Sequence, residues 1–387
     1  MLVLLGLFLL IILAGILENK WHKDNLKKIP YIIHVNGIRG KSSTTRMIHG
    51  GLNAAGYKTI AKTTGTEPRL IYSDGQEEEI IRHGIPRIIE QARIINRLKN
   101  KDIDVLVLEC MAISPEMQWI SEKKLIQASI TVITNVKYDH EDKMGETLEE
   151  IASTLALTIP KNGHLVTASK KFLSKFTEIA QSNNTKVHQV GNLSLELKKH
   201  FQYPVFTENV ACALKVCNLF NIDHDVAIKG MSKTNTDPGS LHFFKAPSGD
   251  YNTYFINSFA ANEYESTLKT WEIWEKWYDF SCYQDLPLIG IFNNRMDRSY
   301  RLKDFQKIIT ALDFNKLFVT GHAPIYLLKR FAFQHHDINK LNIDQIEGQL
   351  ANLTAYYQSD ILLFGFGNTK SQGLKIIEYF TKVGEEL

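Results

Sequence analysis

Apolar residues follow two patterns along this chain, and together they predict alternating strands and helices. Short continuous apolar runs bounded by turn residues predict buried strands, and they lie at 31–35, 103–108, 129–136, 163–168, 253–257, 288–292, 316–320 and 360–364. Apolar residues at helical spacing predict helices over 42–55, 77–99 (kinked or broken at Pro86) and 148–159. This alternation is typical of an α/β fold with a mostly parallel, doubly wound sheet.

The N-terminal segment is apolar and carries no charged side chain. Residues 1–17 read MLVLLGLFLLIILAGIL, and as a helix they span about 25 Å, near the short limit for crossing a bilayer. The first cationic residues follow this run, at Lys20, Lys23, Lys27 and Lys28, and Trp21 lies between the first two of them. This order favours a single uncleaved anchor in the cell membrane with a cytoplasmic body. A cleaved signal peptide, the alternative, carries its positive charge ahead of the apolar run.

Composition and charge exclude several classes of protein. The 387 residues include 45 Lys+Arg and 42 Asp+Glu, with a net charge of +3 and 44% hydrophobic residues. General disorder and a broad nucleic-acid-binding field are therefore excluded, and we expect no nucleic-acid partner. The four cysteines lack C-x-x-C spacing, which excludes a cysteine zinc site and a disulfide framework.

A turn-rich stretch, TNTDPG at 234–239, is the best candidate for a boundary within the body. We therefore expect an anchor over 1–17, a basic linker over 18–29, a larger α/β domain over 30–239 and a smaller C-terminal α/β domain, Rossmann-like, over 240–387.

A glycine loop lies between the first predicted strand of the body and the helix after it. It consists of Gly37, Ile38, Arg39, Gly40, Lys41, Ser42 and Ser43. Its spacing, G-x-x-G-K-S, is shorter than the usual G-x-x-x-x-G-K-[ST]. Backbone N–H groups and a helix N-terminus converge on an anion in this context, so we expect nucleotide binding rather than a chance surface turn. Lys41 is expected to reach the β/γ-phosphates, and Ser42 to join the Mg²⁺ shell.

Two later strand ends bring further polar residues to the same edge of the sheet. Glu109 ends the strand at 103–108, and a carboxylate there suits Mg²⁺. Its alternative is a surface ion pair. The next strand leads into residues 135–142, in which His140 is a candidate ligand of a second metal and Asp139 its orienting partner. A solvated loop histidine is the alternative.

These motifs resemble the Mur ligase superfamily, and more closely its poly-γ-glutamate synthase ligase subunits (PgsB/CapB type). The resemblance extends over nearly the whole chain, through HVNGIRGKSS (34–43), GYKTIAKTTGTEPRLIY (56–72), LECMAISPEMQ (108–118), MGETLEEIA (144–152), TIPKNGHLV (158–166), DPGS (237–240), FINSFAANE (255–263) and FGFGN (364–368). It implies an ADP-forming ligase that uses ATP and Mg²⁺ (or Mn²⁺) to convert a carboxylate into an acyl phosphate, which an amine then attacks.

The resemblance also implies roles for individual residues. Lys41 corresponds to the lysine that holds the transferred phosphate, Ser42 and Glu109 to ligands of the first metal, and His140 to a ligand of the second. Asn209 resembles the asparagine that meets adenine, although a helix-capping asparagine is the alternative. The carbamylated lysine that some Mur ligases carry after the D-H motif has no counterpart, because 148–159 contains no lysine.

Further residues are assigned to the ribose and to the substrate. Asn257 stands where relatives often place an aspartate toward the ribose. Thr64 and Thr66 lie in a hydroxyl-rich loop that we assign to substrate. Arg295 and Arg298 follow a predicted strand, where guanidinium groups suit a carboxylate or phosphate, a solvated charge cluster being the alternative.

The resemblance, together with the apolar N-terminal segment and the glycine loop, leaves three hypotheses for the function. The first is an ATP-dependent ligase that elongates a γ-linked glutamate polymer at the cytoplasmic membrane face, with membrane subunits of the PgsC/CapC and PgsA/CapA kind as implied partners. The second is a ligase that adds glutamate to a soluble acceptor, as folylpolyglutamate synthase does; the anchor argues against it. The third is a membrane-tethered nucleotide-binding scaffold.

Overall fold

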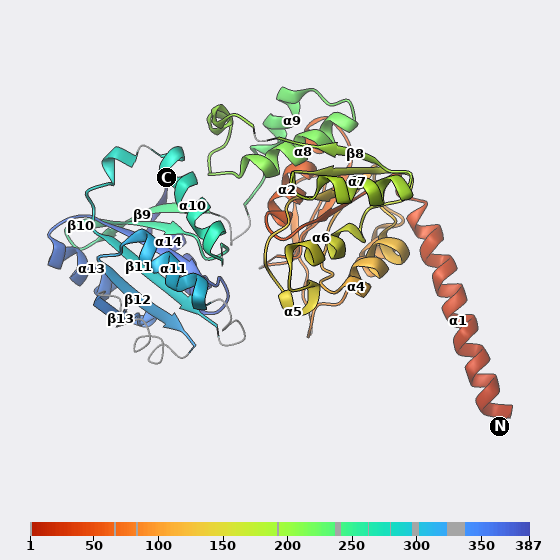
Figure 1. The fold of residues 1–387 in the computed structure, drawn as a ribbon, viewed down its shortest axis with the longest axis horizontal. Coiled ribbons are helices and arrows are strands. Elements are labelled where there is room, and N and C mark those ends of the chain that lie inside the picture. Colours follow the sequence, from red (N-terminus) through yellow and green to blue (C-terminus); the bar gives the residue numbers. More distant parts are fainter. Residues whose placement is uncertain are drawn as a thin grey trace. The chain divides into compact units, whose positions relative to one another are not determined.

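The computed structural model describes residues 2–65, 67–82, 84–191, 193–236, 241–261, 263–278, 280–295, 302–322 and 337–387. The chain forms two compact units (Figure 1): unit 1 comprises residues 1–200 and 206–235, and unit 2 comprises residues 201–205 and 236–387. The domain boundary expected at 239/240 lies just after this division at 235/236, within residues 237–240, which are outside the described residues. Each unit has its own sheet and its own core.

Unit 1 is built on an eight-stranded sheet with the order β4-β3-β2-β5-β1-β6-β7-β8. Six neighbouring strands, β2 to β8 in this order, run parallel, and β3 and β4 add an antiparallel edge. This confirms the expected mostly parallel α/β fold. The strands are β1 (Tyr31–Asn36), β2 (Thr59–Lys62), β3 (Arg69–Ile71), β4 (Glu77–Glu79), β5 (Val105–Glu109), β6 (Ile130–Ile133), β7 (His164–Thr167) and β8 (Lys186–Gln189).

The helices of unit 1 connect these strands and agree with the sequence in two of three cases. They are α1 (Leu2–Leu26), α2 (Lys41–Ala54), α3 (Ile89–Leu98), α4 (Pro115–Ile120), the π-helix η1 (Ser121–Ile126), α5 (Glu141–Met144), α6 (Leu148–Ala156), α7 (Leu173–Ser182), the 3₁₀-helix η2 (Leu195–His200), α8 (Thr207–Leu219) and α9 (His224–Met231). The helices expected over 42–55 and 148–159 are α2 and α6.

The helix expected over 77–99 is wrong in its first half. Residues 77–79 form β4, which pairs with β3, and the helix begins only at Ile89, beyond Pro86. The carboxylate of Glu77 accepts hydrogen bonds from both terminal nitrogens of Arg46 on α2, at 2.6 and 3.0 Å. Pairing with the neighbouring strand β3 and this ion pair to a distant part of the chain override the local helical pattern.

Helix α2, which follows the glycine loop, packs closely against α8 and α9. A methyl group added to Gly50 would lie 2.6 Å from the carbonyl oxygen of Gly230, and one added to Gly230 would lie 2.2 Å from that of Gly50. The backbones of α2 and α9 therefore meet directly at these two glycines, which no larger side chain would permit. This packing fixes the position of α2 and hence of the loop at its start.

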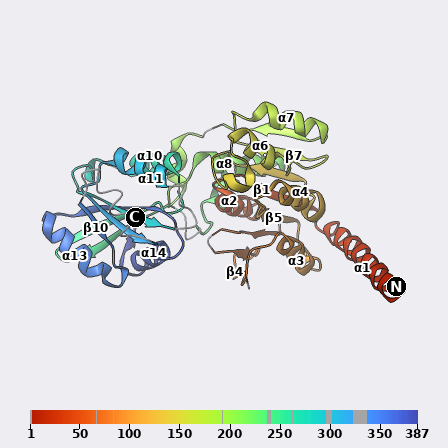
Figure 2. The same ribbon diagram turned by 60° about the horizontal axis from the view of Figure 1, so that its bottom comes forward.

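Helix α1 projects from unit 1 in both views (Figure 1, Figure 2) and is attached at its C-terminal end. Leu26 is buried with residues of α3 and β5. The His22 ring nitrogen Nε2 lies 2.8 Å from the carbonyl oxygen of Leu125, and the Asn25 amide donates to Asn96. The stretch Val3–Leu26 is long and apolar enough to cross a membrane by length and composition, and its most apolar part is not buried.

Unit 2 contains a seven-stranded sheet with the order β13-β12-β11-β14-β10-β9-β15. The strands β10 to β14 are parallel, and β9 and β15 extend the sheet in antiparallel pairs. Its strands are β9 (His242–Ser248), β10 (Tyr251–Asn257), β11 (Leu288–Asn294), β12 (Lys316–Gly321), β13 (Asp337–Lys340), β14 (Ile361–Gly367) and β15 (Glu385–Glu386). The strands expected from the sequence lie within β10, β11 and β12, and the one expected over 360–364 corresponds to β14, which begins one residue later.

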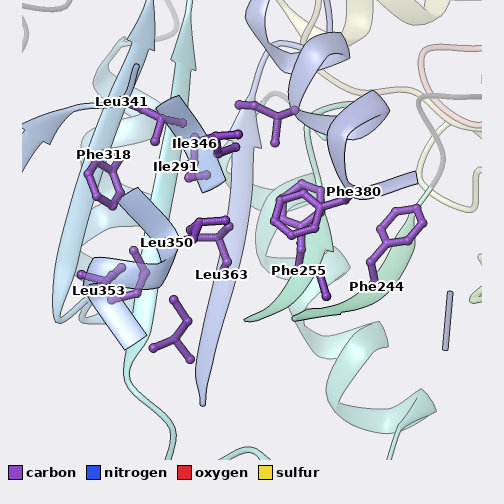
Figure 3. Packing of buried hydrophobic residues seen from close by; sticks show 14 of the residues in the cluster. Phe244, Phe255, Ile291, Phe318, Leu341, Ile346, Leu350, Leu353, Leu363 and Phe380 are labelled. Carbon is purple, nitrogen blue, oxygen red and sulfur yellow. The ribbon is translucent and has the colours of Figure 1, made fainter. Parts of the chain in front are cut away.

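The helices of unit 2 cover this sheet over two hydrophobic clusters. They are α10 (Tyr264–Trp277), the 3₁₀-helix η3 (Phe280–Cys282), α11 (Leu302–Leu312), the 3₁₀-helix η6 (Ile343–Gln345), α13 (Ile346–Tyr357) and α14 (Gln372–Val383). Figure 3 shows one cluster, in which Phe380 of α14 stacks on Phe255 of β10 with ring centroids 4.2 Å apart. Leu350 and Leu353 of α13 belong to the same cluster.

Candidate active site

The glycine loop connects β1 to α2 at the carboxyl edge of the unit 1 sheet. Gly37 and Gly40 have positive φ angles of 122° and 77°, which L-amino acids with a side chain rarely adopt. A methyl group on Gly37 would lie 2.1 Å from Thr134 Oγ1, and one on Gly40 would lie 2.3 Å from Asn209 Nδ2. Both the backbone conformation and the available space therefore require glycine at these two positions.

Side chains at the ends of β1 and β6 hold the loop in place. Asn135 Oδ1 accepts a hydrogen bond from the backbone N–H of Arg39 at 3.0 Å, and Asn135 Nδ2 donates to the Arg39 carbonyl oxygen, also at 3.0 Å. Thr134 Oγ1 donates to the same carbonyl at 2.7 Å. Asn36 Oδ1 accepts from the N–H of Gly37 at 2.8 Å. The loop is thus preorganised by Asn36, Thr134 and the side chain of Asn135, contacts that sequence reasoning missed.

Lys41 is the first residue of α2, and its side chain folds back over the loop. Nζ donates to the carbonyl oxygens of Gly37 at 2.9 Å and Ile38 at 3.3 Å. The first N–H groups of a helix have no partner within the helix, and the helix dipole adds partial positive charge there. An ammonium group and a helix N-terminus therefore meet at one loop, the arrangement that binds phosphate.

Glu109, at the end of β5, lies beside Ser42. Its Oε2 accepts hydrogen bonds from Ser42 Oγ at 2.9 Å and from the backbone N–H of Thr64 at 2.7 Å. Gln91 Nε2, another contact that the sequence did not reveal, donates to the Glu109 carbonyl oxygen at 2.8 Å. Glu109 is only 3% exposed, so it is not the surface ion pair of the alternative interpretation.

The Ser42–Glu109 pair fits a magnesium ion that also binds nucleotide phosphates. Hydroxyl and carboxylate oxygens are hard ligands, and Mg²⁺ in such sites uses one or two protein ligands together with phosphate oxygens and water. Among the described residues, no group of three His, Cys, Asp or Glu side chains could hold a metal ion by itself. A metal held by these two residues would take its remaining ligands from phosphate and water.

The loop after β6 contacts the glycine loop through Asp139. The Asp139 carboxylate lies 3.3 Å from a guanidinium nitrogen of Arg39 and accepts a hydrogen bond from the backbone N–H of His140 at 2.9 Å. His140 has a positive φ of 51° and its ring nitrogen lies 3.9 Å from Asp139. The structure therefore brings residues 135–142, which we call the D-H loop, to the glycine loop, while a metal-binding role for His140 stays a prediction.

A buried ion-pair network lies under this region and was also missed. Lys62, at the end of β2, is fully buried, and its Nζ lies 2.7 Å from Glu90 Oε1. Arg82 donates to both oxygens of Glu90. Burial lowers the pKa of Lys62. Burial alone would raise the pKa of Glu90, but Arg82 and Lys62 outweigh it and lower this pKa to about 2. The network places fixed positive charge near Glu109, on the neighbouring strand.

The remaining predicted residues are distributed over both units. Asn209 is buried on α8 against Gly40 and is the third residue of that helix, so the capping alternative is wrong. Asn257, at the end of β10, and Arg295, after β11, lie in unit 2. Thr64 contributes its backbone N–H to Glu109. Thr66 and Arg298 lie outside the described residues.

Comparison with known proteins gives the family. The Mur ligase middle domain matches residues 35–236, and the poly-gamma-glutamate synthase CapB C-terminal domain matches residues 244–383. The chain is 37% identical to the capsule biosynthesis protein CapB of Bacillus anthracis, over 95% of this chain and 80% of that protein. It is 36% identical to the PGA synthase CapB of Bacillus subtilis, over 95% of this chain and 94% of that protein.

The fold is also shared with solved structures. The folylpolyglutamate synthase of Mycobacterium tuberculosis, complexed with ADP and AMPPCP, superimposes with a TM-score of 0.68 at 15% identity, covering 95% of this chain and 94% of that one. At this identity the likeness shows the fold alone. The family matches and the two relatives, which span nearly the whole chain, show that it belongs to the CapB family of poly-γ-glutamate synthases within the Mur ligase superfamily.

Proposed function

We propose that this chain is an ATP-dependent, ADP-forming ligase that joins the γ-carboxylate of one glutamate to the amine of another and so builds poly-γ-glutamate. Its relatives of 36–37% identity are a capsule biosynthesis protein and a PGA synthase. The observation that carries the chemistry is the pair of Ser42 Oγ and Glu109 Oε2, 2.9 Å apart beside a glycine loop that begins a helix. A carboxylate and a hydroxyl are held there where a metal–triphosphate complex would need them.

Different residues of unit 1 would bind the phosphates and the metal ion during phosphoryl transfer. The loop N–H groups, the start of α2 and Lys41 would bind the β- and γ-phosphates, and Ser42 and Glu109 would hold Mg²⁺ or Mn²⁺. When bound, the metal–ATP complex supplies the phosphoryl group and neutralises its charge. The γ-carboxylate becomes an acyl phosphate, and the attacking amine releases inorganic phosphate. Catalysis rests mainly on positioning and charge neutralisation by Lys41 and the loop.

Further residues complete the proposed site. His140, oriented by Asp139, would bind a second divalent ion, and Asn209 would contact the adenine side of the nucleotide. Asn257 would face the ribose. Thr64 and Thr66, with Arg295 and Arg298, would contact glutamate or the growing chain, because hydroxyl and guanidinium groups bind carboxylates well.

We place the enzyme at the membrane, with its body in the cytoplasm. Support comes from α1, whose apolar stretch is followed by lysines rather than preceded by them. A polymer that leaves the cell needs its ligase near an exit path, and we propose membrane subunits of the PgsC/CapC and PgsA/CapA kind as partners.

The test follows phosphate release and product size with the full chain in membranes, ATP, Mg²⁺ and labelled glutamate. Wild type should release phosphate only with glutamate and form a γ-linked product that lengthens with time. Lys41→Ala should lower this turnover by at least about 10³-fold, because it removes the positive charge that would neutralise the transferred phosphate. Lys229→Ala, an exposed lysine on α9, is the matched control and should remain active.

Near-normal ligation by Lys41→Ala, with unchanged thermal unfolding, would contradict the proposed mechanism. Turnover that requires a folate acceptor would instead indicate a folylpolyglutamate-synthase-like ligase. If purified partner subunits restore no glutamate-dependent turnover, the chain is a nucleotide-binding scaffold.

A further inference from the structure

One edge of the unit 1 sheet is rich in lysine. The six parallel strands begin at this edge, where the register aligns Tyr31 with Val105 and Ile130 with His164. The segments that lead into these strands place lysines along it, and we name as the basic edge Lys28, Lys99, Lys101, Lys124 and Lys161. Lys123 lies in one of these segments but is half-buried and donates to the carbonyl oxygen of Ile159. Three acidic residues near these lysines contact other lysines of the same edge: Asp24 pairs with Lys27, Asp102 pairs with Lys58, and Asp104 accepts from the Lys58 backbone N–H.

Two exposed tryptophans lie among these lysines. Lys99 Nζ is 4.2 Å from the ring centroid of Trp21, and Lys124 Nζ is 5.2 Å from that of Trp119. Trp21 is 59% exposed and Trp119 is 43% exposed. Lysines at the C-terminal ends of helices can simply complement the helix dipole. That explanation does not account for exposed tryptophans beside them, whereas tryptophan and lysine together are typical of a bilayer interface.

Helix α1 joins unit 1 at this same edge. His22 contacts Leu125 of η1, and Asn25 contacts Asn96 of α3, so the C-terminal end of α1 is docked beside both lysine-bearing segments. If the apolar part of α1 crosses a bilayer, these contacts hold the basic edge close to the headgroups. Trp119 is far from α1 in sequence, so its exposure is independent of the anchor.

We propose that the basic edge of unit 1 lies on the anionic headgroup surface of the bilayer that α1 enters. Positive charge near a membrane surface is attracted to anionic lipids within about a Debye length. The proposal rests on the membrane position assigned to α1 and not on the ligase chemistry. It also sets the orientation of the site: β1 has six residues, so the glycine loop lies about 20 Å further from the lipid, on the cytoplasmic side.

The test places a photocrosslinking residue, p-benzoylphenylalanine, at Trp119 or at Tyr138 of the full chain. Tyr138 is a matched control: it is 49% exposed and follows β6, at the opposite edge of the sheet. Both variants are reconstituted in vesicles of phosphatidylcholine with or without 30% phosphatidylglycerol. We expect lipid crosslinks from position 119 in the anionic vesicles and none above background from position 138.

Charge dependence separates headgroup attraction from simple proximity to the anchor. The triple substitution Lys28→Gln, Lys124→Gln and Lys161→Gln, all at exposed positions, should lower the crosslink yield at position 119 by at least about fivefold, since each lysine near an anionic surface changes partitioning by roughly that factor. Raising salt to about 0.5 M should act in the same direction. Equal yields at positions 119 and 138, or a yield at 119 that ignores lipid charge and the triple substitution, would overturn the proposal. Neither readout depends on ligase activity.

Discussion

Gly40→Ala tests the conformation of the glycine loop and the position of Asn209 together. Gly40 has φ 77° and ψ 8°, the left-handed conformation, and immediately precedes α2. Alanine in this conformation costs about 1–2 kcal/mol. The added methyl group would also lie 2.3 to 2.7 Å from the side-chain atoms of Asn209, and such overpacking costs about 1–3 kcal/mol. We therefore expect a loss of stability of about 2–5 kcal/mol.

Only the overpacking depends on Asn209, so its cost can be separated from that of the backbone strain. In an Asn209→Ala background the methyl group has room, so the same Gly40→Ala change should cost only the backbone strain. Thermal unfolding of the full chain in detergent micelles measures the difference, since 1 kcal/mol shifts the midpoint by about 2–4 °C in a domain of this size. The double variant should thus lose at least about 2 °C less than the sum of the two single variants.

Additivity would refute the reasoning. If the two single effects sum to that of the double variant within about 0.5 kcal/mol, the methyl group does not meet Asn209. Nucleotide binding gives a second readout, because the shift in midpoint on adding MgATP should shrink in Gly40→Ala, with or without Asn209.

Two further substitutions test the groups around Glu109. Glu90→Gln leaves Lys62 buried without its carboxylate and should destabilise the chain by about 3–5 kcal/mol at pH 7. The pKa of Glu90 is lowered from 4.5 to about 2 in the folded chain. The extra stability of the wild type should therefore be present above pH 4.5 and disappear as the pH falls through 2. A difference in unfolding midpoint between wild type and variant that stays constant over this range would contradict the ion pair between Glu90 and Lys62. Glu109→Gln should raise the Mg²⁺ concentration for half-maximal phosphate release by about 10–100-fold, whereas Glu116→Gln, an exposed control on α4, should not; equal Mg²⁺ dependence would exclude Glu109 as a ligand.

Much of the fold follows from local sequence pattern. The strands at 103–108 and 288–292 are continuous apolar runs, and such runs become buried parallel strands wherever helices cover both faces of a sheet. The pattern failed at 77–79, where helical spacing is present but the residues pair with β3 and with Arg46. Nothing within 77–99 itself shows that Arg46 would come close, because that contact depends on how α2 is packed.

The candidate site also contains residues that the sequence predicts and contacts that it does not. The glycine loop, Glu109 and the D-H loop are recognisable because each directly follows a strand, and parallel strands end at one edge. The contacts that hold them there join residues far apart in sequence: Asn135 with Arg39, Gln91 with Glu109, and Lys62 with Glu90. Single polar residues give no periodic signal, so sequence alone does not pair them. A polar side chain directly before a G-x-x-G-K-S loop, such as Asn36, is the one local cue that was available.

A single oxygen atom, Glu109 Oε2, receives both the Ser42 hydroxyl and the Thr64 N–H. A cation that binds this oxygen would compete with both donors, one from the glycine loop and one from the segment assigned to substrate. A cation bound at Glu109 Oε2 would therefore affect the backbone at Thr64 as well as the Ser42 hydroxyl.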